Sequence, residues 1–388
     1  MAIDLIETPK IKFAEGDSNP KPTGDGAEIP VIIGITGNST PATGILKFKN
    51  YTSAAKSIAN GGIGTDPTTN PVLAYLKNFF KENVKKESTD LVVPYVYVID
   101  LGTGKTTGQT PALDNAAWTA AFAKAKVKRD ASAEVLVGFK KTDTAANIIP
   151  LIEAALESIS EDAVKGNPRI LYFTVDGMTM TELSALTDSS SAKYIQSSRV
   201  GLVGPADDFG DICARIFTTH YSEEPGYEEF RSIKPEYFTE RTDDEEDDLM
   251  NAGIIFGRDE KPGKSVYPKI CLAVSTAFAK EADTRPHDCL LHARRNVDQL
   301  IRDAFEVLYP QLKRNETEIN LSYLQADVDN LVTDKKEKGY MMEGTYIDVQ
   351  ESASNPYDLE VNGVAVPVNA TELIRFTMYI ESPNTTIG

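Results

Sequence analysis

The sequence predicts an α/β protein (α+β overall), in which an α/β sheet domain is followed by a C-terminal α+β core domain with extended N- and C-terminal arms. Short apolar segments alternate with helix-type segments over about residues 29–220, which is typical of a mainly parallel sheet. A long amphipathic segment at 286–309 is followed by further helix-type and then strand-type segments. The predicted parts, in chain order, are an arm at 1–28, the α/β domain at 29–225, the C-terminal core domain at 226–370 and an arm at 371–388.

The first half of the chain alternates between two kinds of segment. Strand-type segments are short and apolar, and they lie at 29–37, 91–100, 134–139, 169–177 and 199–205. Helix-type segments lie between and after them, at 71–84, 115–126, 145–159, 180–196 and 207–221. Asn70 followed by Pro71 is a typical helix start, whereas Pro150 predicts a kink or a late start in its helix.

The second half has longer helix-type segments. One apolar stripe at helical spacing runs along 286–309, formed by Leu290, Val297, Ile301, Ala304 and Leu308. A second helix-type segment at 320–338 precedes strand-type segments at 340–350 and 358–368. Within the last of these, Asn362-Gly363 is the typical two-residue turn of a hairpin.

An acidic run separates the two halves. Residues 240–260 hold nine acidic and two basic side chains. Because these carboxylates repel one another, the run predicts a solvated loop or a helix start. A calcium site is a weaker interpretation, since calcium loops need spaced ligands and a glycine turn.

Both ends of the chain carry apolar residues that cannot form a core of their own. Residues 1–28 have short alternating pieces, Ile3 with Leu5 and Ile11 with Phe13, between polar stretches rich in glycine and proline. The last strand-type segment, 372–380, alternates strictly and includes Ile374, Phe376, Met378 and Ile380. Such segments become ordered by pairing with another strand. A frayed N-terminus is the alternative for residues 1–28.

Composition and charge exclude several classes of partner. The 388 residues carry a net charge of −18 and have a sequence pI of about 4.7. Nucleic acid and direct membrane insertion are therefore not expected, because duplex binding needs a basic face and a membrane span needs about 20 apolar residues. The N-terminus has no secretion signal pattern. Three cysteines without close spacing predict reduced, buried thiols.

The stretch IDLGTGKTTG at 99–108 follows a strand and resembles a nucleotide-phosphate loop. The full pattern needs a glycine five residues before Gly104, where Ile99 stands, and a helix that starts at the Lys-Thr pair. Gly108 and Pro111 interrupt a helix there. We therefore expect Lys105 to be solvated and replaceable, and the strand from Val92 to Ile99 to be buried.

No other motif supports a catalytic or metal site. Gly34 and Gly37 lack the leading glycine pair of a dinucleotide fingerprint. His287, Cys289 and His292 share a helix-type segment, but i,i+5 spacing points the two rings about 140° apart. The hydrolase elbow and the zinc-protease helix motif are both missing from the sequence. We predict no catalytic residue, no metal and no cofactor.

The order of these features resembles that of contractile tail sheath proteins, which occur in contractile-tailed phages and related contractile injection systems. The resemblance rests on an N-terminal arm before VIIGITG, the helix TNPVLAYLKNFF before the strand PYVYVIDL, a long helix with Ala-Arg-Arg near its start, and an alternating last strand. It is strongest at 29–37, 71–100 and 286–382. The usual Pro-Gly-Val-Tyr start is absent, and Phe256-Gly257 stands where Trp-Gly is often found.

The resemblance implies a structural, non-enzymatic subunit with the α/β domain on the outside. Such subunits stack as six-fold rings around an inner tail tube protein and end on baseplate and tail-terminator proteins. It implies that arm residues Ile3, Leu5, Ile11, Phe13, Ile374, Phe376, Met378 and Ile380 add strands to the sheets of neighbours, and that Arg294, Arg295 and Arg302 face the tube. The particle would be a virion tail or injection system, assembled in the host cytoplasm.

Two alternatives remain open from the residues alone. The segment 285–314 holds six Lys/Arg and four Asp/Glu, so its arginines are either a weakly basic tube contact or ordinary surface residues of an amphipathic helix. The whole chain is alternatively an α/β nucleotide-phosphate-binding enzyme that uses the 102–108 loop GTGKTTG, or a soluble adhesin or scaffold of the same fold class.

Overall fold

A computed structural model describes residues 27–87, 90–106, 113–232, 241–258, 268–281, 284–286, 288–311, 321–351 and 359–368. The arm residues predicted to exchange strands, Ile3, Leu5, Ile11, Phe13, Ile374, Phe376, Met378 and Ile380, lie outside the described residues. His287 and residues 107–108 of the GTGKTTG loop do so as well.

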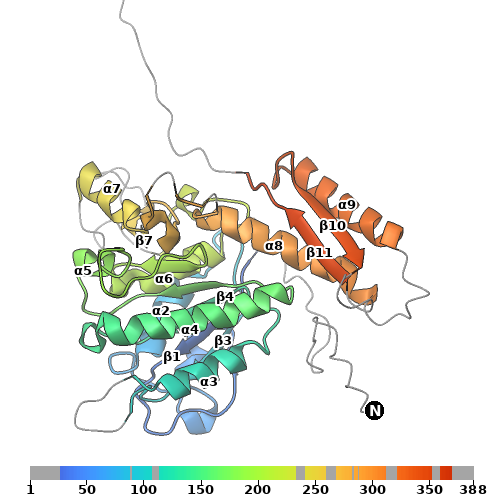
Figure 1. The fold of residues 1–388 in the computed structure, drawn as a ribbon. Helices are drawn as coiled ribbons and strands as arrows, with labels where there is room; N and C mark the ends of the chain where they lie inside the picture. The colour runs from blue at the N-terminus through green and yellow to red at the C-terminus, as the bar shows by residue number, and fades with distance from the viewer. Residues whose placement is uncertain are drawn as a thin grey trace, which may run out of the picture.

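A seven-stranded sheet, in the order β2-β3-β1-β4-β5-β6-β7, forms the centre of the molecule (Figure 1). In that order its strands are Leu46–Phe48, Val96–Asp100, Pro30–Gly34, Ala133–Val137, Ile170–Phe173, Val200–Val203 and Ile254–Ile255. All neighbours pair in parallel except β2, which runs antiparallel to β3. The mainly parallel sheet predicted from the alternating segments is confirmed.

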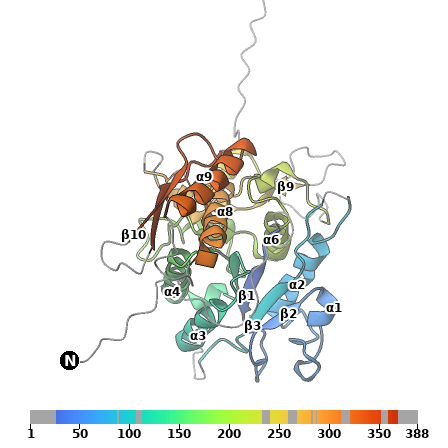
Figure 2. The same cartoon turned by 90° about the vertical axis from the view of Figure 1, so that its right-hand side faces the viewer.

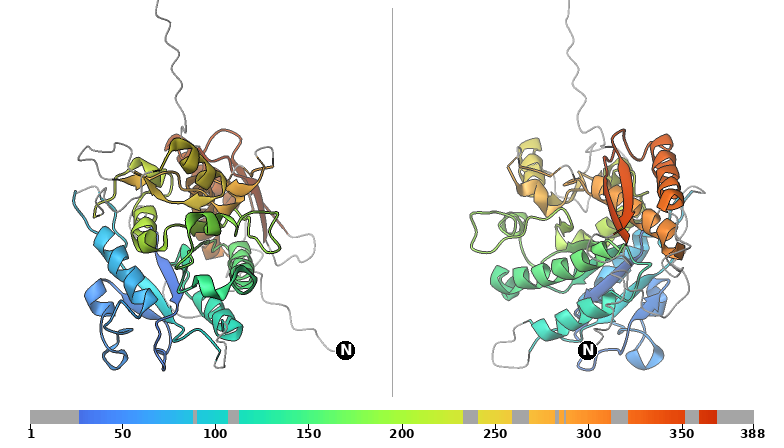
Figure 3. Two further views of the ribbon diagram at one scale, coloured as in Figure 1. Left: turned by 90° about the vertical axis from the view of Figure 1, so that its left-hand side faces the viewer. Right: turned by 45° about the vertical axis from the view of Figure 1, so that its right-hand side comes forward.

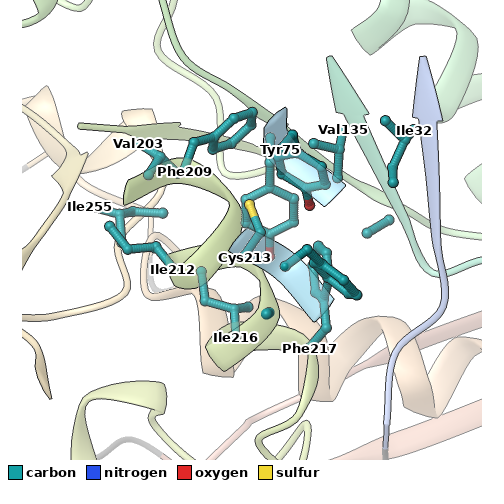
Figure 4. Close-up of a cluster of buried hydrophobic side chains, with 14 of the residues drawn as sticks. Ile32, Tyr75, Val135, Val203, Phe209, Ile212, Cys213, Ile216, Phe217 and Ile255 are labelled. Atoms are coloured by element: carbon teal, nitrogen blue, oxygen red, sulfur yellow. The ribbon is translucent and has the colours of Figure 1, made fainter. Parts of the chain in front are cut away.

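Helices cover both faces of this sheet, and each strand therefore sends apolar side chains in both directions. Ile32 of β1 belongs to the core under α2 (Pro71–Glu82) and α6 (Phe209–Phe217), part of which is shown in Figure 4. Its neighbours Val31 and Ile33 belong to the core under α3 (Asn115–Ala125) and α4 (Ala145–Val164). All three strand residues are fully buried.

Several shorter elements connect the main ones. The short helices are α1 (Tyr51–Ala54), α5 (Met180–Ser184) and the 3-10 turns η2 (Ile58–Asn60), η3 (Lys141–Asp143), η4 (Ala206–Asp208), η5 (Pro225–Tyr227) and η7 (Thr276–Ala279). A small antiparallel pair is formed by β8 (Gly257–Arg258) and β9 (Lys269–Ile270). None of the helices in the described part of the chain is both long and apolar enough to cross a membrane.

Local sequence signals explain where most helices begin. The Asn70 side chain accepts a hydrogen bond from the Leu73 amide at 2.9 Å, and Pro71 opens α2 as predicted. The late start predicted for the helix with Pro150 is wrong, because α4 begins at Ala145 and includes the proline.

The predicted helix over 180–196 is mostly wrong, because α5 ends at Ser184. The polar run that follows bonds to its own backbone instead. Asp188 accepts hydrogen bonds from the amide of Ser190 at 2.8 Å and from its hydroxyl at 2.7 Å. Such local bonds compete with helix formation.

The acidic run forms the helix α7 (Asp243–Asn251), so its interpretation as a helix start is confirmed. Thr242 and Glu245 cap one another in a capping box. No residue of α7 is buried. In the part of the chain that the structure describes, no three His, Cys, Asp or Glu side chains are placed to hold a metal ion.

The C-terminal elements form a small unit beside the large sheet (Figures 1 and 3). They are α8 (Leu291–Leu308), η8 (Tyr309–Gln311), α9 (Leu321–Glu337), β10 (Tyr346–Glu351) and β11 (Leu359–Val364). Strands β10 and β11 pair antiparallel as a separate two-stranded sheet. A third apolar core joins this sheet to α9 and to the second half of α8.

The hairpin turn predicted at Asn362-Gly363 is wrong. Asn362 pairs with Asp348 and Gly363 pairs with Ile347, in the middle of the β10–β11 ladder. A Cβ atom at Gly363 would lie 2.4 Å from the carbonyl oxygen of Tyr346. The glycine therefore allows close approach of two strands rather than a turn.

The predicted domain boundary at residue 225 falls within a continuous core. Strand β7 completes the large sheet, and Phe230 and Ile270 pack in the same core as α2 and α6. Helix α8 also shares this core through Leu291 and Ala293, whereas its later residues Leu300, Ala304 and Leu308 pack against α9. Figure 2 shows α8 between α9 and the helices of the α/β body.

Candidate functional site

The β10–β11 sheet contains two strands, and no third strand pairs with it in the described part of the chain. The outer edge of β10 is partly occupied, because the Gln325 side chain of α9 donates to the carbonyl of Ile347 at 2.7 Å and accepts from the amide of Val349 at 2.9 Å. The unpaired edge is therefore that of β11. An unpaired edge offers a row of backbone N–H and C=O groups to any additional strand. Isolated two-stranded sheets are marginal in water, so this one depends on what packs against it.

Helix α9 covers only part of the inner face of this sheet. Ile347 and Val349 of β10 are buried against the α9 residues Leu324, Val328 and Val332. Val361 of β11 lies directly opposite Val349, on the same face, yet it is 43% exposed. The apolar inner face therefore continues beyond the cover that α9 provides.

The outer face of the sheet also carries exposed apolar side chains. Tyr346 and Val364 lie opposite each other in the ladder and are 55% and 44% exposed. Met342 and Val368, which flank the two strands, are exposed as well. With Val361 on the inner face, both faces of the open sheet thus carry exposed apolar residues, which are together called its apolar surface, and exposed apolar clusters mark interaction sites.

The arginines of α8 lie beside this unit, and the structure binds them into the subunit. Arg294 is 9% exposed and donates hydrogen bonds to Asp288 at 2.7 Å and to Asp298. Burial disfavours its charged form, but Asp298 and Asp288 outweigh burial and raise the pKa of Arg294. The i,i+4 spacing of Arg294 and Asp298 was readable from the sequence.

Arg295 is 1% exposed and lies on the opposite side of α8 from solvent. Its Nη2 atom donates a hydrogen bond to the carbonyl of Thr219 at 2.6 Å, and its Nε atom lies 3.1 Å from the carboxylate of Glu28. Burial, only partly offset by Arg295 and Arg302, raises the pKa of Glu28. Nothing in the local sequence pointed to Glu28 as a partner.

Arg302 is partly buried and donates to the carbonyl of Pro168 at the amino end of β5. Burial lowers its pKa. The exposed basic patch expected at this helix is therefore not formed by Arg294 and Arg295, whose guanidinium groups are paired inside the subunit. Their contact with a tube stays a prediction.

The glycine-rich loop after β3 is occupied by the protein's own groups. Lys105 is an ion pair with Asp143 at 2.5 Å, and its side chain is only 20% exposed, so the prediction of a solvated lysine is wrong. The indole of Trp118 donates to the carbonyl of Gly104 at 3.3 Å. A phosphate would have to displace Asp143 from the lysine.

The strand before this loop is buried only in its second part. Residues Val96–Asp100 of β3 are buried, whereas Val92 is 36% exposed. At the end of the strand, Asp100 accepts hydrogen bonds from Thr36 at 2.6 Å and from the amides of Ala42 and Gly102. The edge of the sheet where a nucleotide would bind is closed by this network.

The histidine and cysteine side chains have structural surroundings. His292 is 1% exposed, and its Nδ1 atom lies 2.8 Å from Glu224. Cys213 and Cys289 are buried, and burial raises the pKa of Cys271 to about 11. These are the features of inert thiols.

No protein-family model matches this chain, and no curated protein matches its sequence. Solved structures do resemble its fold. The helical sheath of the anti-feeding prophage (AFP) in the contracted state aligns with a TM-score of 0.60 at 13% identity, over 95% of this chain and 98% of that chain.

Two further structures give the same picture. The PVC sheath complex of an extracellular contractile injection system, in the contracted state, aligns with a TM-score of 0.59 at 10% identity, over 98% of this chain and 97% of that chain. A sheath tail protein from Desulfitobacterium hafniense aligns with a TM-score of 0.57 at 11% identity, over 92% and 97%. The structural neighbours of this chain are contractile tail sheath proteins, and the chain has their fold.

Proposed function

We propose that this chain is a structural subunit of a contractile tail sheath. It polymerises as stacked hexameric rings around an inner tube and contracts to drive the tube through a target envelope. The chain performs no enzymatic step, because contraction releases free energy stored in the extended lattice. The observation that carries the proposal is the agreement in fold with sheath proteins over at least nine-tenths of both chains.

The open β10–β11 sheet gives this function a physical basis. The unpaired edge of β11 can accept a strand from a neighbouring copy through main-chain hydrogen bonds, which tolerate rotation of the attached domains, whereas at β10 an added strand would have to displace Gln325. Ile3, Leu5, Ile11 and Phe13 of the N-terminal arm, and Ile374, Phe376, Met378 and Ile380 of the C-terminal arm, are the proposed donors. An added strand would also cover the apolar surface around Val361 and Val364.

The proposed partners are further copies of this chain, an inner tail tube protein, and baseplate and tail-terminator proteins. The particle is a virion tail or injection system assembled in the host cytoplasm. Tube contact through α8 is part of the proposal, with Arg302 as the least buried of its three arginines. Arg294 and Arg295 would contribute only if their internal partners were exchanged.

Electron microscopy of the purified chain tests this function. At high concentration the full-length protein should form striated tubes, whereas chains that lack residues 1–20 or 371–388 should remain folded monomers. A full-length protein that stays monomeric would count against a sheath subunit. Truncated chains that polymerise normally would exclude strand exchange by the arms.

The rival nucleotide-binding enzyme makes an opposite prediction for the glycine-rich loop. Trp118 is the only tryptophan, and it contacts this loop, so its fluorescence reports on ligand binding there. Saturable binding of ATP or GTP that is lost in Lys105→Ala would support the enzyme. Flat calorimetric and fluorescence titrations at millimolar nucleotide would remove it. A soluble adhesin or scaffold would show neither nucleotide binding nor tubes.

A further inference from the structure

The point where the N-terminal arm meets the α/β body is held by a buried ion pair. The body begins at residues 27–29, immediately before β1. The amide of Glu28 donates to the carbonyl of Phe217 at 3.0 Å, and the carbonyl of Ile29 accepts from Ser132 at 2.9 Å. The chain is therefore bonded to α6 on one side and to the segment before β4 on the other.

The carboxylate of Glu28 makes a third connection. It lies 3.1 Å from Nε of Arg295, whose side chain is fully buried, and Glu28 itself is 12% exposed. The same guanidinium donates through Nη2 to the carbonyl of Thr219. Arg295 thus connects α8 to the base of the arm through Glu28 and to the segment after α6 through Thr219.

Among the described residues, Glu28 is the only carboxylate within 4 Å of Arg295, and the exposed Glu223 acts on the guanidinium from farther away. The Nε and Nη1 atoms of Arg295 are buried without a hydrogen bond, as is the hydroxyl of Tyr172. Asp298, the other carboxylate near Glu28, is already paired with Arg199 and Arg294. Loss of the Glu28 charge would leave a buried cation with no carboxylate within 4 Å, which is strongly unfavourable.

We propose that Glu28 and Arg295 are positioning residues that fix where the N-terminal arm leaves the subunit, so that the arm departs at a defined place relative to α8 and the β10–β11 sheet. Glu28 thereby links the base of the arm to α8, whose second half packs in the same core as the β10–β11 sheet. The inference rests on the proposed function in one respect, the use of the arm by a neighbouring copy.

The control comes from a second buried ion pair in the same body. Glu134 and Arg169 are both fully buried and lie 2.7 Å apart, on β4 and just before β5. Glu134 is paired with Val31 in the sheet, so this control breaks a buried ion pair close to the base of the arm while leaving Glu28 in place. Breaking either pair removes a carboxylate from a buried arginine, although Arg169 keeps Asp162 at 3.7 Å. Only the first is expected to change the base of the arm.

The experiment measures the distance between spin labels at Ala27→Cys and Lys124→Cys in the monomer, in a Cys271→Ser background. Cys213 and Cys289 are buried and should not react. We expect a narrow distance distribution in the parent, at least a twofold broadening in Glu28→Gln, and no broadening in Glu134→Gln. An unchanged width in Glu28→Gln, or equal broadening in Glu134→Gln, would overturn the proposal.

A second variant covers the case in which Glu28→Gln does not fold. Glu28→Gln combined with Arg295→Met removes both charges, so it should fold and still show the broadened distribution. A narrow distribution in this folded double variant would also contradict a positioning role. Tube yield in Glu28→Gln should fall at least tenfold against Glu134→Gln at equal folded fraction. If the parent protein forms no tubes, the proposed function fails, but the distances in the monomer still test whether Glu28 and Arg295 position the base of the arm.

Discussion

The α/β body and the C-terminal unit differ in how fully the faces of their strands are covered. In the body, β1 is covered on both faces, and Val31, Ile32 and Ile33 are all fully buried. In the C-terminal unit, α9 covers only part of one face of the two-stranded sheet, and Val361 and Val364 remain more than two-fifths exposed. Among the described residues, the strands of the body are therefore covered, whereas those of the C-terminal unit are partly uncovered, as the proposed strand addition requires.

Charged groups show the same difference. The body buries charges in pairs such as Glu134 with Arg169, and both side chains are inaccessible to water. The outer face of the open sheet carries Asp348 and Glu360 exposed beside Tyr346. Exposed carboxylates on this face oppose non-specific association through it.

The largest expected effect is on the body. Phe217 is fully buried and packs edge-on against Tyr172 with ring centroids 5.3 Å apart. Phe217→Ala should lower the free energy of unfolding by about 3–5 kcal/mol, because it leaves a cavity that α6 and the sheet cannot close. Urea unfolding followed by Trp118 fluorescence measures it. A loss below about 1 kcal/mol would mean that the body core is not tightly packed.

The junction between the two regions gives the next effect. Gly166 has φ +77°, and a Cβ atom there would lie 2.0 Å from Cδ2 of Phe305 on α8. Gly166→Ala should cost about 2–4 kcal/mol, from steric overlap and from the left-handed backbone. Adding Phe305→Ala should recover the steric part. Thermal unfolding measures both, and a silent Gly166→Ala would show that α8 does not dock at this loop.

A buried carboxylate of α6 makes the stability of the body depend on pH. Asp211 is 4% exposed, and burial, helped by the nearby carboxylates of Glu82 and Asp208, raises its pKa to about 7. Its unfolded pKa is about 4, so the folded chain binds the extra proton between these values. Its contribution to stability is complete below pH 4 and is lost as the pH rises through 7.

Asp211→Asn should therefore stabilise the chain by about 2 kcal/mol at pH 8 and have little effect at pH 5. This is less than the full pKa difference implies, because the amide gives up the favourable charge in the first turn of α6. Denaturant unfolding at the two pH values measures the difference. Equal effects at both would show that Asp211 titrates normally.

The smallest effect on the monomer is expected at the open sheet. Val364→Thr keeps the β-branched shape and should change the free energy of unfolding by less than about 0.5 kcal/mol, since the side chain is 44% exposed. The same change should reduce tube formation, because it places a hydroxyl on the apolar surface of the open sheet. A large loss of monomer stability with normal tube formation would show that Val364 stabilises the monomer and does not take part in assembly.

The sequence predicted the body better than the C-terminal unit. Alternation of apolar and helical segments and the Asn70-Pro71 start depend on near neighbours in the chain, and both are confirmed. The pairing of Lys105 with Asp143 joins residues 38 positions apart, and Glu28 meets Arg295 from the far end of the chain, so local patterns could not reveal either contact. The turn predicted at Asn362-Gly363 is wrong because glycine, which is common in turns, also allows two strands to approach closely.

The exposure of Val361 and Val364 could not be predicted from the sequence either. A strand that waits for a neighbour has the same alternation as a strand that is already covered, since both are apolar on the face that becomes buried. Only the position of α9 over β10 shows which residues are left uncovered.

The antiparallel strand β2 has a consequence for the fidelity of assembly. In the proposed lattice, strands from neighbouring copies should add only to the β10–β11 sheet and not to the edges of the large sheet. The edge strand β2 is three residues long, and its central Lys47 extends over the ring of Tyr95, 3.3 Å from the ring centroid. A short edge strand with a central lysine discourages strand addition at this edge of the large sheet.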